Sequence, residues 1–341
     1  MRILVVTNMY PSKEHPALGT FVQQQVKGLT EIGVEVELMV MDRWGRGPFA
    51  YYGLAGRVAR RVNDSDLDLV HVMYGGVMAR AVASVAMRIP LVVSLCGDDM
   101  LGTVGAWPVA VVRSWLNRTA SIKACTIADG VVVKSRNLTR AIAPFIDRAK
   151  VHLIPNGIDT ERFCPLERGA CIRLLGWRTD SFHIVFPLNG DPTVKRLRLA
   201  ERSAELARGL GIPAEFHPLQ GVPHEEVPVW LNAGDVLLLT SVHEGSPNII
   251  KEGLACDIPV VSVDVGDVAE RIRGVEGCHI VAADPMSIAL RLQTVAVRGS
   301  RIEGRSCVAD LSLSSVAQRL RLLYNLLLEK RRGVGDTLCV E

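Results

Sequence analysis

Two glutamates, Glu244 and Glu252, stand eight positions apart, and a Gly-Ser-Pro-Asn segment directly follows the first of them. The apolar run at 235–239 is typical of a buried parallel strand. Ser246 suits the N-cap of a following helix, and Pro247 suits its first position. Because the first amides of a helix have no internal partners, this turn is suited to bind a phosphate or a sugar hydroxyl.

The two carboxylates are predicted to face one crevice. Helical side chains tilt toward the N-terminus of their helix, which brings Glu252 back toward Glu244. A carboxylate accepts hydrogen bonds from two vicinal hydroxyls at once. The pair therefore suits a ligand with a hexose at one end and a ribose at the other, although two solvated glutamates on a helix would show the same spacing.

The composition is that of an ordinary globular protein large enough for two domains. The chain has 341 residues, of which 48% are hydrophobic and 22% charged. A net charge of +3 argues against a nucleic-acid binder. The charge is uneven, however, with 18 Lys and Arg against 12 Asp and Glu up to Pro155. Either the first half meets something anionic, such as a lipid diphosphate or a membrane surface, or the imbalance is random.

The cysteines and the N-terminus favour a cytoplasmic protein. The eight cysteines form no CxxC pair and show no regular spacing, as is typical of reduced thiols. The first residues lead directly into an apolar strand, so no signal peptide is expected, and no apolar run approaches the length of a membrane span.

Apolar runs that alternate with helical stretches predict two doubly wound parallel sheets, an α/β fold. Helical spacing is clearest at 21–32, at 197–208 and in a long amphipathic stretch at 312–332, whereas 162–180 indicates a surface excursion. The predicted strands are 2–7, 34–40, 69–73, 91–95, 130–133, 151–154, 183–187, 214–219, 235–239 and 259–263.

The segment from Glu244 to Glu252 resembles the signature of the retaining glycosyltransferases of family 4, which have the GT-B fold. A second match, Ile154-Pro-Asn-Gly-Ile-Asp159, is similar to the segment where chains of this family leave their first domain. The resemblance implies two Rossmann-like domains facing across a cleft. The acceptor-side domain would comprise residues 1–155 and the nucleotide-sugar domain 156–310, with 311–341 forming a helix that crosses back.

The resemblance also implies roles for the signature. Glu244 and the backbone after it would hold the donor sugar, and Glu252 would hold the ribose of the nucleotide. The backbone positions implied in sugar binding are Gly245, Ser246, Pro247 and Asn248.

Two further loops of the second half match the family. Lys195 stands where related enzymes place a lysine that clamps the diphosphate, and Arg196 is expected to supply a second charge, because Asn189 or Gly190 occupies the place of the family's arginine. Gly221 follows a predicted strand where the family seats the base. Plain surface charge is the alternative for the Lys-Arg pair.

The first half contributes predicted contacts at the ends of its own strands. Gly19 and Thr20 open a helix in the position that lies against the donor phosphates and the acceptor in the resembled family, and Asn156 lies in the interdomain turn. Cys96 stands where family members often have a histidine, so a histidine-dependent step has no counterpart there. Asp98 and Asp99 resemble a metal-binding pair, but adjacent aspartates point apart, so they are predicted to shape the loop or bind the acceptor rather than a metal, with Asp98 as the predicted contact.

The sequence thus predicts a retaining, metal-independent hexosyltransferase that needs no cofactor besides its nucleotide-sugar donor, most simply a UDP-sugar. Glu244, Lys195 and Arg196 are the predicted catalytic residues. The acceptor is expected to be a sugar or lipid-linked sugar in cell-envelope or exopolysaccharide assembly, with contact to an anionic membrane. The alternatives are a sugar-nucleotide epimerase or hydrolase, and a non-catalytic sugar-nucleotide-binding protein.

Overall fold

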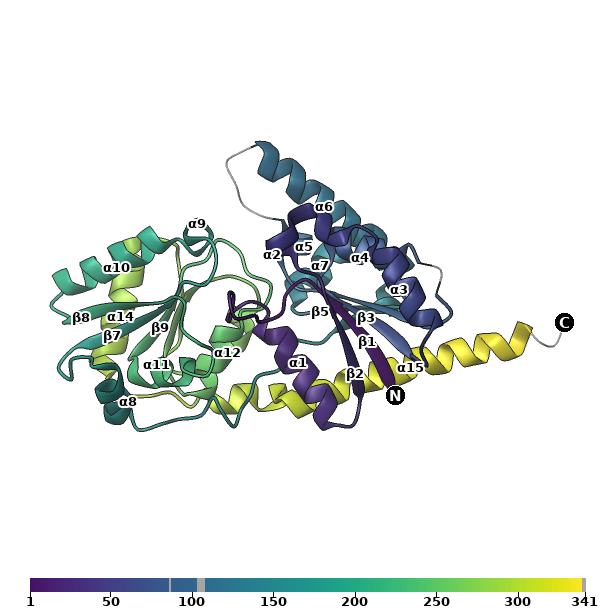
Figure 1. The fold of residues 1–341 in the computed structure, drawn as a ribbon. Helices are drawn as coiled ribbons and strands as arrows, with labels where there is room; N and C mark the ends of the chain where they lie inside the picture. The colour runs from purple at the N-terminus through teal and green to yellow at the C-terminus, as the bar shows by residue number, and fades with distance from the viewer. Residues whose placement is uncertain (86, 103–107, 339–341) are drawn as a thin grey trace. The chain divides into compact units, whose positions relative to one another are not determined.

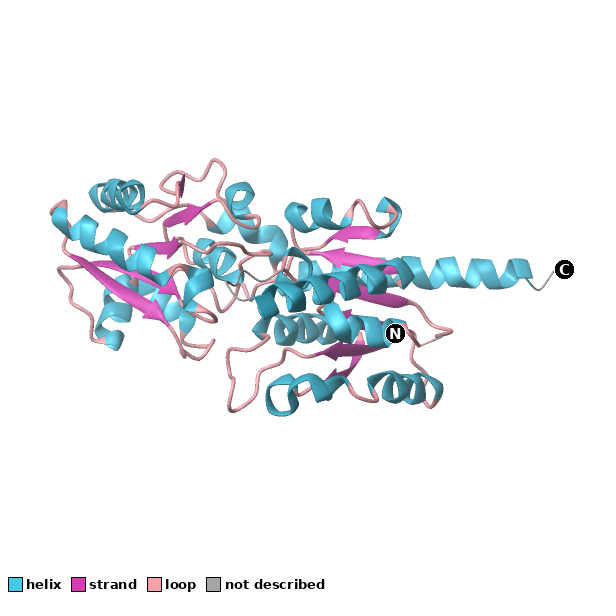
Figure 2. Cartoon of the chain, turned by 90° about the horizontal axis from the view of Figure 1, so that it is seen from above, coloured by secondary structure: helices cyan, strands magenta, loops and turns pink. Residues whose placement is uncertain are grey.

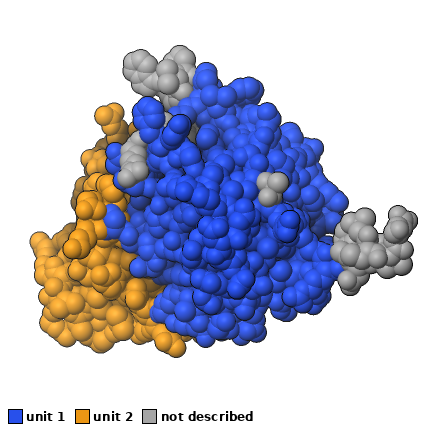
Figure 3. Space-filling view, turned by 45° about the vertical axis from the view of Figure 1, so that its right-hand side comes forward, with its two compact units in different colours: residues 1–12, 18–157, 313–341 blue, residues 13–17, 158–312 orange. Residues whose placement is uncertain are grey.

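The computed structural model describes residues 1–85, 87–102 and 108–338. The chain divides into two compact units (Figure 3). Unit 1 comprises residues 1–12, 18–157 and 313–341, and unit 2 comprises residues 13–17 and 158–312. Each unit is built around one parallel β-sheet with helices on both of its faces (Figures 1 and 2).

The sheet of unit 1 has six parallel strands in the order β2-β1-β3-β4-β5-β6. The order reverses between β1 and β3, which makes the carboxyl ends of these two strands a topological switch point. Its central strands β3, β4 and β5 are buried at every position, because helices cover both faces. The strands are β1 (Arg2–Thr7), β2 (Glu35–Val40), β3 (Leu69–Met73), β4 (Leu91–Leu95), β5 (Gly130–Val133) and β6 (Val151–Leu153).

The helices of unit 1 connect these strands, and the last of them returns from the end of the chain. They are α1 (Thr20–Glu31), α2 (Arg43–Arg46), the 3₁₀ helix η1 (Gly47–Tyr51), α3 (Leu54–Asn63), α4 (Gly76–Ala83), α5 (Asp98–Leu101), α6 (Pro108–Ile127), α7 (Arg136–Ile142), the 3₁₀ helix η2 (Arg148–Lys150) and α15 (Leu313–Leu338).

Helix α15 is fixed to unit 1 by close packing and by a buried hydrogen bond. It packs against α1, where a Cβ atom on Gly28 would lie 2.9 Å from the carbonyl oxygen of Leu313. The hydroxyl of Tyr324 lies 2.7 Å from Nδ1 of His71 on β3, and both side chains are fully buried. The small residue at Gly28 therefore lets the two helices approach each other.

The sheet of unit 2 has five parallel strands in the order β11-β10-β9-β7-β8. Here the order reverses between β7 and β9. The strands are β7 (Phe182–Pro187), β8 (Ala214–Leu219), β9 (Val236–Leu239), β10 (Val260–Val263) and β11 (His279–Val281). The helices are α8 (Arg168–Leu175), α9 (Pro192–Lys195), α10 (Leu197–Gly209), α11 (Val227–Ala233), α12 (Asn248–Ala255), α13 (Val268–Arg271), α14 (Pro285–Arg298) and the 3₁₀ helix η3 (Arg305–Leu311).

The predicted α/β class with two doubly wound parallel sheets is confirmed, but two local predictions are wrong and one strand was missed. Helix α12 begins at Asn248 with Pro247 at the N-cap, and Ser246 does not cap it, because the Ser246 hydroxyl donates to Asp267 instead. The predicted surface excursion contains α8, which buries Cys171 and Ile172. Strand β11 was not predicted, because three residues beginning with a histidine form no apolar run.

Candidate functional site

The switch point of the second sheet brings Lys195 and Glu244 together. Lys195 ends α9, the short helix after β7, and Glu244 lies in the loop after β9. Because β7 and β9 are neighbours at the point where the strand order reverses, the loops after them flank one crevice. Nζ of Lys195 lies 2.6 Å from Oε1 of Glu244, and each side chain is more than four-fifths buried.

Backbone and hydroxyl contacts hold this ion pair in place. The hydroxyl of Ser241 donates to the same Glu244 oxygen at 2.7 Å. The hydroxyl of Thr240 donates to the carbonyl of Lys195 at 2.7 Å, and the amide of Val242 donates to the carbonyl of Val194 at 2.8 Å. The two loops are therefore tied together along their backbones, and the charged groups meet as a consequence.

The loop between Glu244 and α12 rests on the loop after β10. Ser246 donates to Oδ2 of Asp267 at 2.8 Å, and Arg271 donates to the same oxygen at 3.2 Å. Gly266, at φ 59°, lies directly under the loop, since a Cβ there would be 3.3 Å from the Glu244 carbonyl oxygen and 3.1 Å from Cδ of Pro247. Only glycine satisfies both the left-handed backbone and this close approach.

Glu252 is buried on α12 and is oriented by a histidine. Its Oε1 lies 2.9 Å from Nε2 of His224, which stands in the loop after β8. The imidazole of His224 lies in turn against the ring of Phe163, with 5.2 Å between the ring centroids. Because one oxygen of the carboxylate is held this way, the position of the other is also defined.

Unit 1 carries its predicted residues at the carboxyl ends of β1 and β4. Gly19 is the N-cap of α1 at φ 68°, and a Cβ there would lie 2.3 Å from the backbone of Met9. Thr20 begins the helix and leaves its side chain half-buried. Position 19 therefore requires glycine, both for its backbone conformation and for space.

The loop after β4 is organised by Asp99, the neighbour of Asp98. Asp99 is fully buried and accepts from the amides of Gly75, at 2.7 Å, and Gly97, at 2.8 Å, and from that of Cys96. Burial raises the pKa of Asp99, while these amides oppose the rise. Asp98 is exposed, and burial also raises the pKa of the Cys96 thiol, which keeps it protonated.

A lysine that the sequence analysis did not select is buried at the carboxyl end of β5. Lys134 is fully buried, and its ammonium donates to Oε1 of Gln25 at a long 3.4 Å. Burial lowers the pKa of Lys134 to about 8, although Cys96 and Asp99 oppose this shift. Such a side chain is held at a cost in stability.

The remaining predicted residues take no part in the side-chain contacts described above for the ion pair, although Arg196 directly follows Lys195 in the chain. Arg196 joins α9 to α10 in a left-handed conformation, with φ 52°, and Gly221 is an exposed residue at φ 68° after β8. Asn156 is buried near the end of unit 1. The sequence analysis did not select three residues that hydrogen-bond to the predicted site, namely His224, Ser241 and Asp267. No local sequence pattern marks a hydrogen-bonding partner of this kind.

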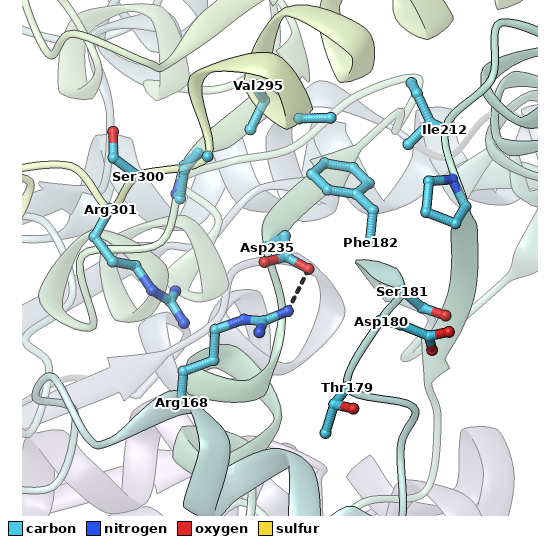
Figure 4. Close-up of a pocket in the computed structure, with 14 residues that line it drawn as sticks. Arg168, Thr179, Asp180, Ser181, Phe182, Ile212, Asp235, Val295, Ser300 and Arg301 are labelled. Carbon is cyan, nitrogen blue, oxygen red and sulfur yellow. Dashed lines mark hydrogen bonds and ion pairs between the residues drawn. The ribbon is translucent and has the colours of Figure 1, made fainter.

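A cavity of about 410 Å³ lies beside the amino ends of strands of the second sheet, whereas Lys195 and Glu244 follow carboxyl ends (Figure 4). Its lining includes Phe182 and Asp235, which lie at the amino ends of β7 and β9. Arg168 donates to Asp235 there at 2.8 Å, and Arg301 lies alongside. None of the predicted site residues lines this cavity.

Two family models match consecutive parts of the chain. The model described as Glycosyltransferase Family 4 matches residues 5–162, and the one described as Glycosyl transferases group 1 matches residues 183–296. Their order along the chain follows the division into two parallel-sheet units. The chain belongs to glycosyltransferase family 4. The predicted family is thereby confirmed, and the protein is a glycosyltransferase.

Curated relatives of this glycosyltransferase are distant. A D-inositol 3-phosphate glycosyltransferase from Geodermatophilus obscurus is 26% identical over 50% of this chain, and the match spans 46% of that relative's length. The putative teichuronic acid biosynthesis glycosyltransferase TuaC from Bacillus subtilis is 22% identical over 79% of this chain and 82% of its own.

A solved structure supports the fold assignment. The Anabaena protein Alr3699/HepE, in a complex with UDP and glucose, superposes with a TM-score of 0.71 at 16% identity. The superposition covers 95% of this chain and 99% of that one. At this identity the likeness establishes the GT-B-like fold alone. Among the described residues, no helix is both long and apolar enough to cross a membrane.

Proposed function

We propose that this family 4 enzyme is a retaining glycosyltransferase that moves a hexose from a nucleoside diphosphate sugar, most simply a UDP-sugar, to a hydroxyl acceptor. The observation that carries the proposal is the 2.6 Å contact between Lys195 and Glu244 at the switch point of the second sheet. It places a cation and a carboxylate where doubly wound sheets bind their ligands. The complex of Alr3699/HepE with UDP and glucose supports the choice of donor.

Lys195 has the chemistry to stabilise the departing diphosphate. When the bond between the anomeric carbon and the phosphate oxygen breaks, negative charge grows on the leaving group, and a fixed ammonium lowers the barrier by about 2.7–4 kcal/mol. Arg196 and the first amides of α12 add positive potential. Glu244 remains held by Ser241 when Lys195 turns to the phosphate, and it then positions the sugar and stabilises positive character at the anomeric carbon.

The transfer is proposed to occur on one face of the sugar. The acceptor oxygen forms its bond to the anomeric carbon on the side that the diphosphate leaves, and the acceptor proton passes to a diphosphate oxygen. Glu252, oriented by His224, accepts from the ribose hydroxyls. The scheme requires no protein nucleophile and no metal ion.

The acceptor side of the proposal rests on unit 1. Its helix α6 exposes Val111, Val112, Trp115 and Leu116 near its first turns, and Trp115 is 62% exposed. Arg113 lies in the same stretch, so the surface combines apolar and basic side chains as a contact with anionic lipid requires. An acceptor in cell-envelope polysaccharide assembly agrees with the naming of TuaC.

Donor binding and transfer test the proposal together. The unfolding midpoint is measured with UDP, GDP, ADP and their sugar conjugates, for the wild type and Glu252→Ala. Ligand at 100 times its dissociation constant is expected to raise the midpoint by roughly 5–10 °C in the wild type and not in the variant. Turnover of the bound donor only in the presence of an acceptor panel is then expected. Rearrangement of the sugar without acceptor, or the absence of any nucleotide shift, contradicts the proposal.

A further inference from the structure

Three potential metal ligands share one face of the second sheet, away from the proposed donor site. His183 is on β7, and Glu215 and His217 are on the neighbouring edge strand β8. The register pairs His183 with Glu215 and Val185 with His217. Because side chains two residues apart on a strand point to the same face, all three converge.

The separations of the three ligand atoms fit a tetrahedral metal ion. Nδ1 of His183 lies 3.0 Å from Nε2 of His217, and Oε2 of Glu215 lies 3.6 Å from the first nitrogen and 3.7 Å from the second. In a tetrahedral zinc site with bonds of about 2.0–2.1 Å, neighbouring ligand atoms are roughly 3.3–3.4 Å apart. One ion at the centre of this triangle reaches all three atoms with only small adjustments of the side chains.

Two of the outer atoms, one on His183 and one on Glu215, have hydrogen-bond partners. Nε2 of His183 lies 2.7 Å from the carbonyl oxygen of Arg178, and since a carbonyl only accepts, this nitrogen carries the hydrogen. Nδ1 is then left with its lone pair toward the centre. The hydroxyl of Ser181 donates to Oε1 of Glu215 at 2.8 Å, which leaves Oε2 facing the histidines. Outer hydrogen bonds of this kind orient the ligands of known metal sites.

The surroundings hold the ligands but leave an approach. The indole of Trp177 stacks on the ring of His217, with 3.6 Å between centroids, and fixes its plane. His183 is fully buried, whereas the side chain of Glu215 is 31% exposed. An ion can therefore enter from the side of the carboxylate, which also leaves a fourth position open to solvent.

We propose that His183, Glu215 and His217 bind one Zn²⁺ ion per chain. Two imidazoles and one carboxylate, with one open position, form a ligand set that zinc accepts. The ion would join the edge strand β8 to β7 and to the loop that carries Arg178. His183 and Glu215 lie near the amino ends of their strands, whereas Lys195 and Glu244 follow carboxyl ends, so the ion stabilises unit 2 and takes no part in glycosyl transfer.

The test is zinc binding by the full chain after dialysis against a chelator. Zinc content is measured by mass spectrometry, and the unfolding midpoint is followed as ZnCl₂ is added. One equivalent of zinc and a rise of roughly 5–10 °C at 100 times the dissociation constant are expected for the wild type. Co²⁺ is used as a second probe because the chain has free cysteines that could also bind a metal ion. The Co²⁺ spectrum should lack a thiolate charge-transfer band, since the proposed ligands are two imidazoles and a carboxylate.

Glu215→Gln and His217→Phe are the informative variants. The first keeps a partner for Ser181, and the second keeps a ring to stack on Trp177, so both are expected to fold and to lose the zinc equivalent and the thermal shift. His279→Phe, on β11 of the same unit, is the matched control and should bind like the wild type. If the dialysed wild type takes up no zinc when ZnCl₂ is added, a hydrogen bond between the two histidines explains the cluster and the proposal is wrong. Undiminished binding by both variants would overturn it as well.

Discussion

Nζ of Lys195 and Oε1 of Glu244 lie 2.6 Å apart, although 49 positions separate the two residues in the chain. Each residue follows a different strand of the second sheet, and the hydrogen bond from Thr240 to the Lys195 carbonyl holds their loops together. The hydroxyl of Ser241 holds the same Glu244 oxygen, so the carboxylate and the backbone of Lys195 both have defined positions. In the proposed reaction only the Lys195 ammonium has to turn toward the diphosphate, and charged groups positioned in this way are the condition for effective electrostatic catalysis.

Lys195→Met and Glu244→Gln are each expected to lower kcat by roughly 10²–10³. The double variant should lose little more than the worse single variant, because the two residues act as a unit. Steady-state kinetics of transfer measure this. Arg202→Met is the control, since Arg202 pairs with Glu205 on the exposed side of α10 and should leave kcat unchanged. Losses that simply multiply in the double variant would show that the residues act independently.

His224→Ala is expected to weaken nucleotide binding roughly tenfold, because a hydrogen bond that orients the Glu252 carboxylate is lost. Calorimetric titration with the nucleotide that shifts the unfolding midpoint measures the affinity. In a Glu252→Ala background the same substitution should have no further effect. An equal loss in both backgrounds would mean that His224 acts through some other contact.

Gly266→Ala and Gly274→Ala form a matched pair. Both glycines have a left-handed backbone, at φ 59° and 77°, but a Cβ at Gly274 meets nothing within 4 Å. A side chain in this conformation costs about 1–2 kcal/mol, which lowers the unfolding midpoint by roughly 2–8 °C in either variant. Only Gly266→Ala should also weaken binding of the nucleotide sugar, because its methyl group displaces the Glu244 loop. Equal donor affinity in the two variants would contradict this role of the loop.

Lys134→Met is expected to stabilise the protein at neutral pH by about 3 kcal/mol, because the folded-state pKa of Lys134 is lowered to about 8 from an ordinary value near 10.5. Between these two pH values the unfolded chain binds a proton that the folded chain does not, so wild-type stability rises with pH. The advantage of the variant should therefore shrink from pH 8 to pH 10.5. Urea unfolding across this range measures it, with the exposed Lys123→Met as the control. A pH-independent difference would be inconsistent with a shifted pKa.

Trp115→Ser is expected to reduce binding to vesicles that contain anionic lipid, since Trp115, at 62%, is the most exposed of the apolar side chains described on α6. Co-sedimentation with anionic and with neutral vesicles measures the binding. Leu174→Ser, on α8 of the other unit, removes a similarly exposed apolar side chain and should change nothing. The same sedimentation for wild type and Trp115→Ser would exclude α6 as the membrane contact.

The sequence alone indicated the family and both sheets. Fully buried parallel strands such as β3 and β9 are continuous apolar runs, and such runs are visible without a structure. The resemblance of the segment from Glu244 to Glu252 supplied the family. Short or half-exposed elements such as β11 and α8 were not visible, because their apolar contacts come from other parts of unit 2.

Only the tertiary structure decided which partner each site residue contacts. The local rule for helix caps selected Ser246 as the N-cap of α12, yet its hydroxyl bonds to Asp267 across 21 positions. In the same way, Glu252 could be chosen from the sequence but His224 could not, and the convergence of His183 with Glu215 and His217 depends on the register of β7 and β8. Local propensities act within a few residues along the chain. Hydrogen bonds and charge pairs form between whichever groups the packed sheets bring within about 3 Å.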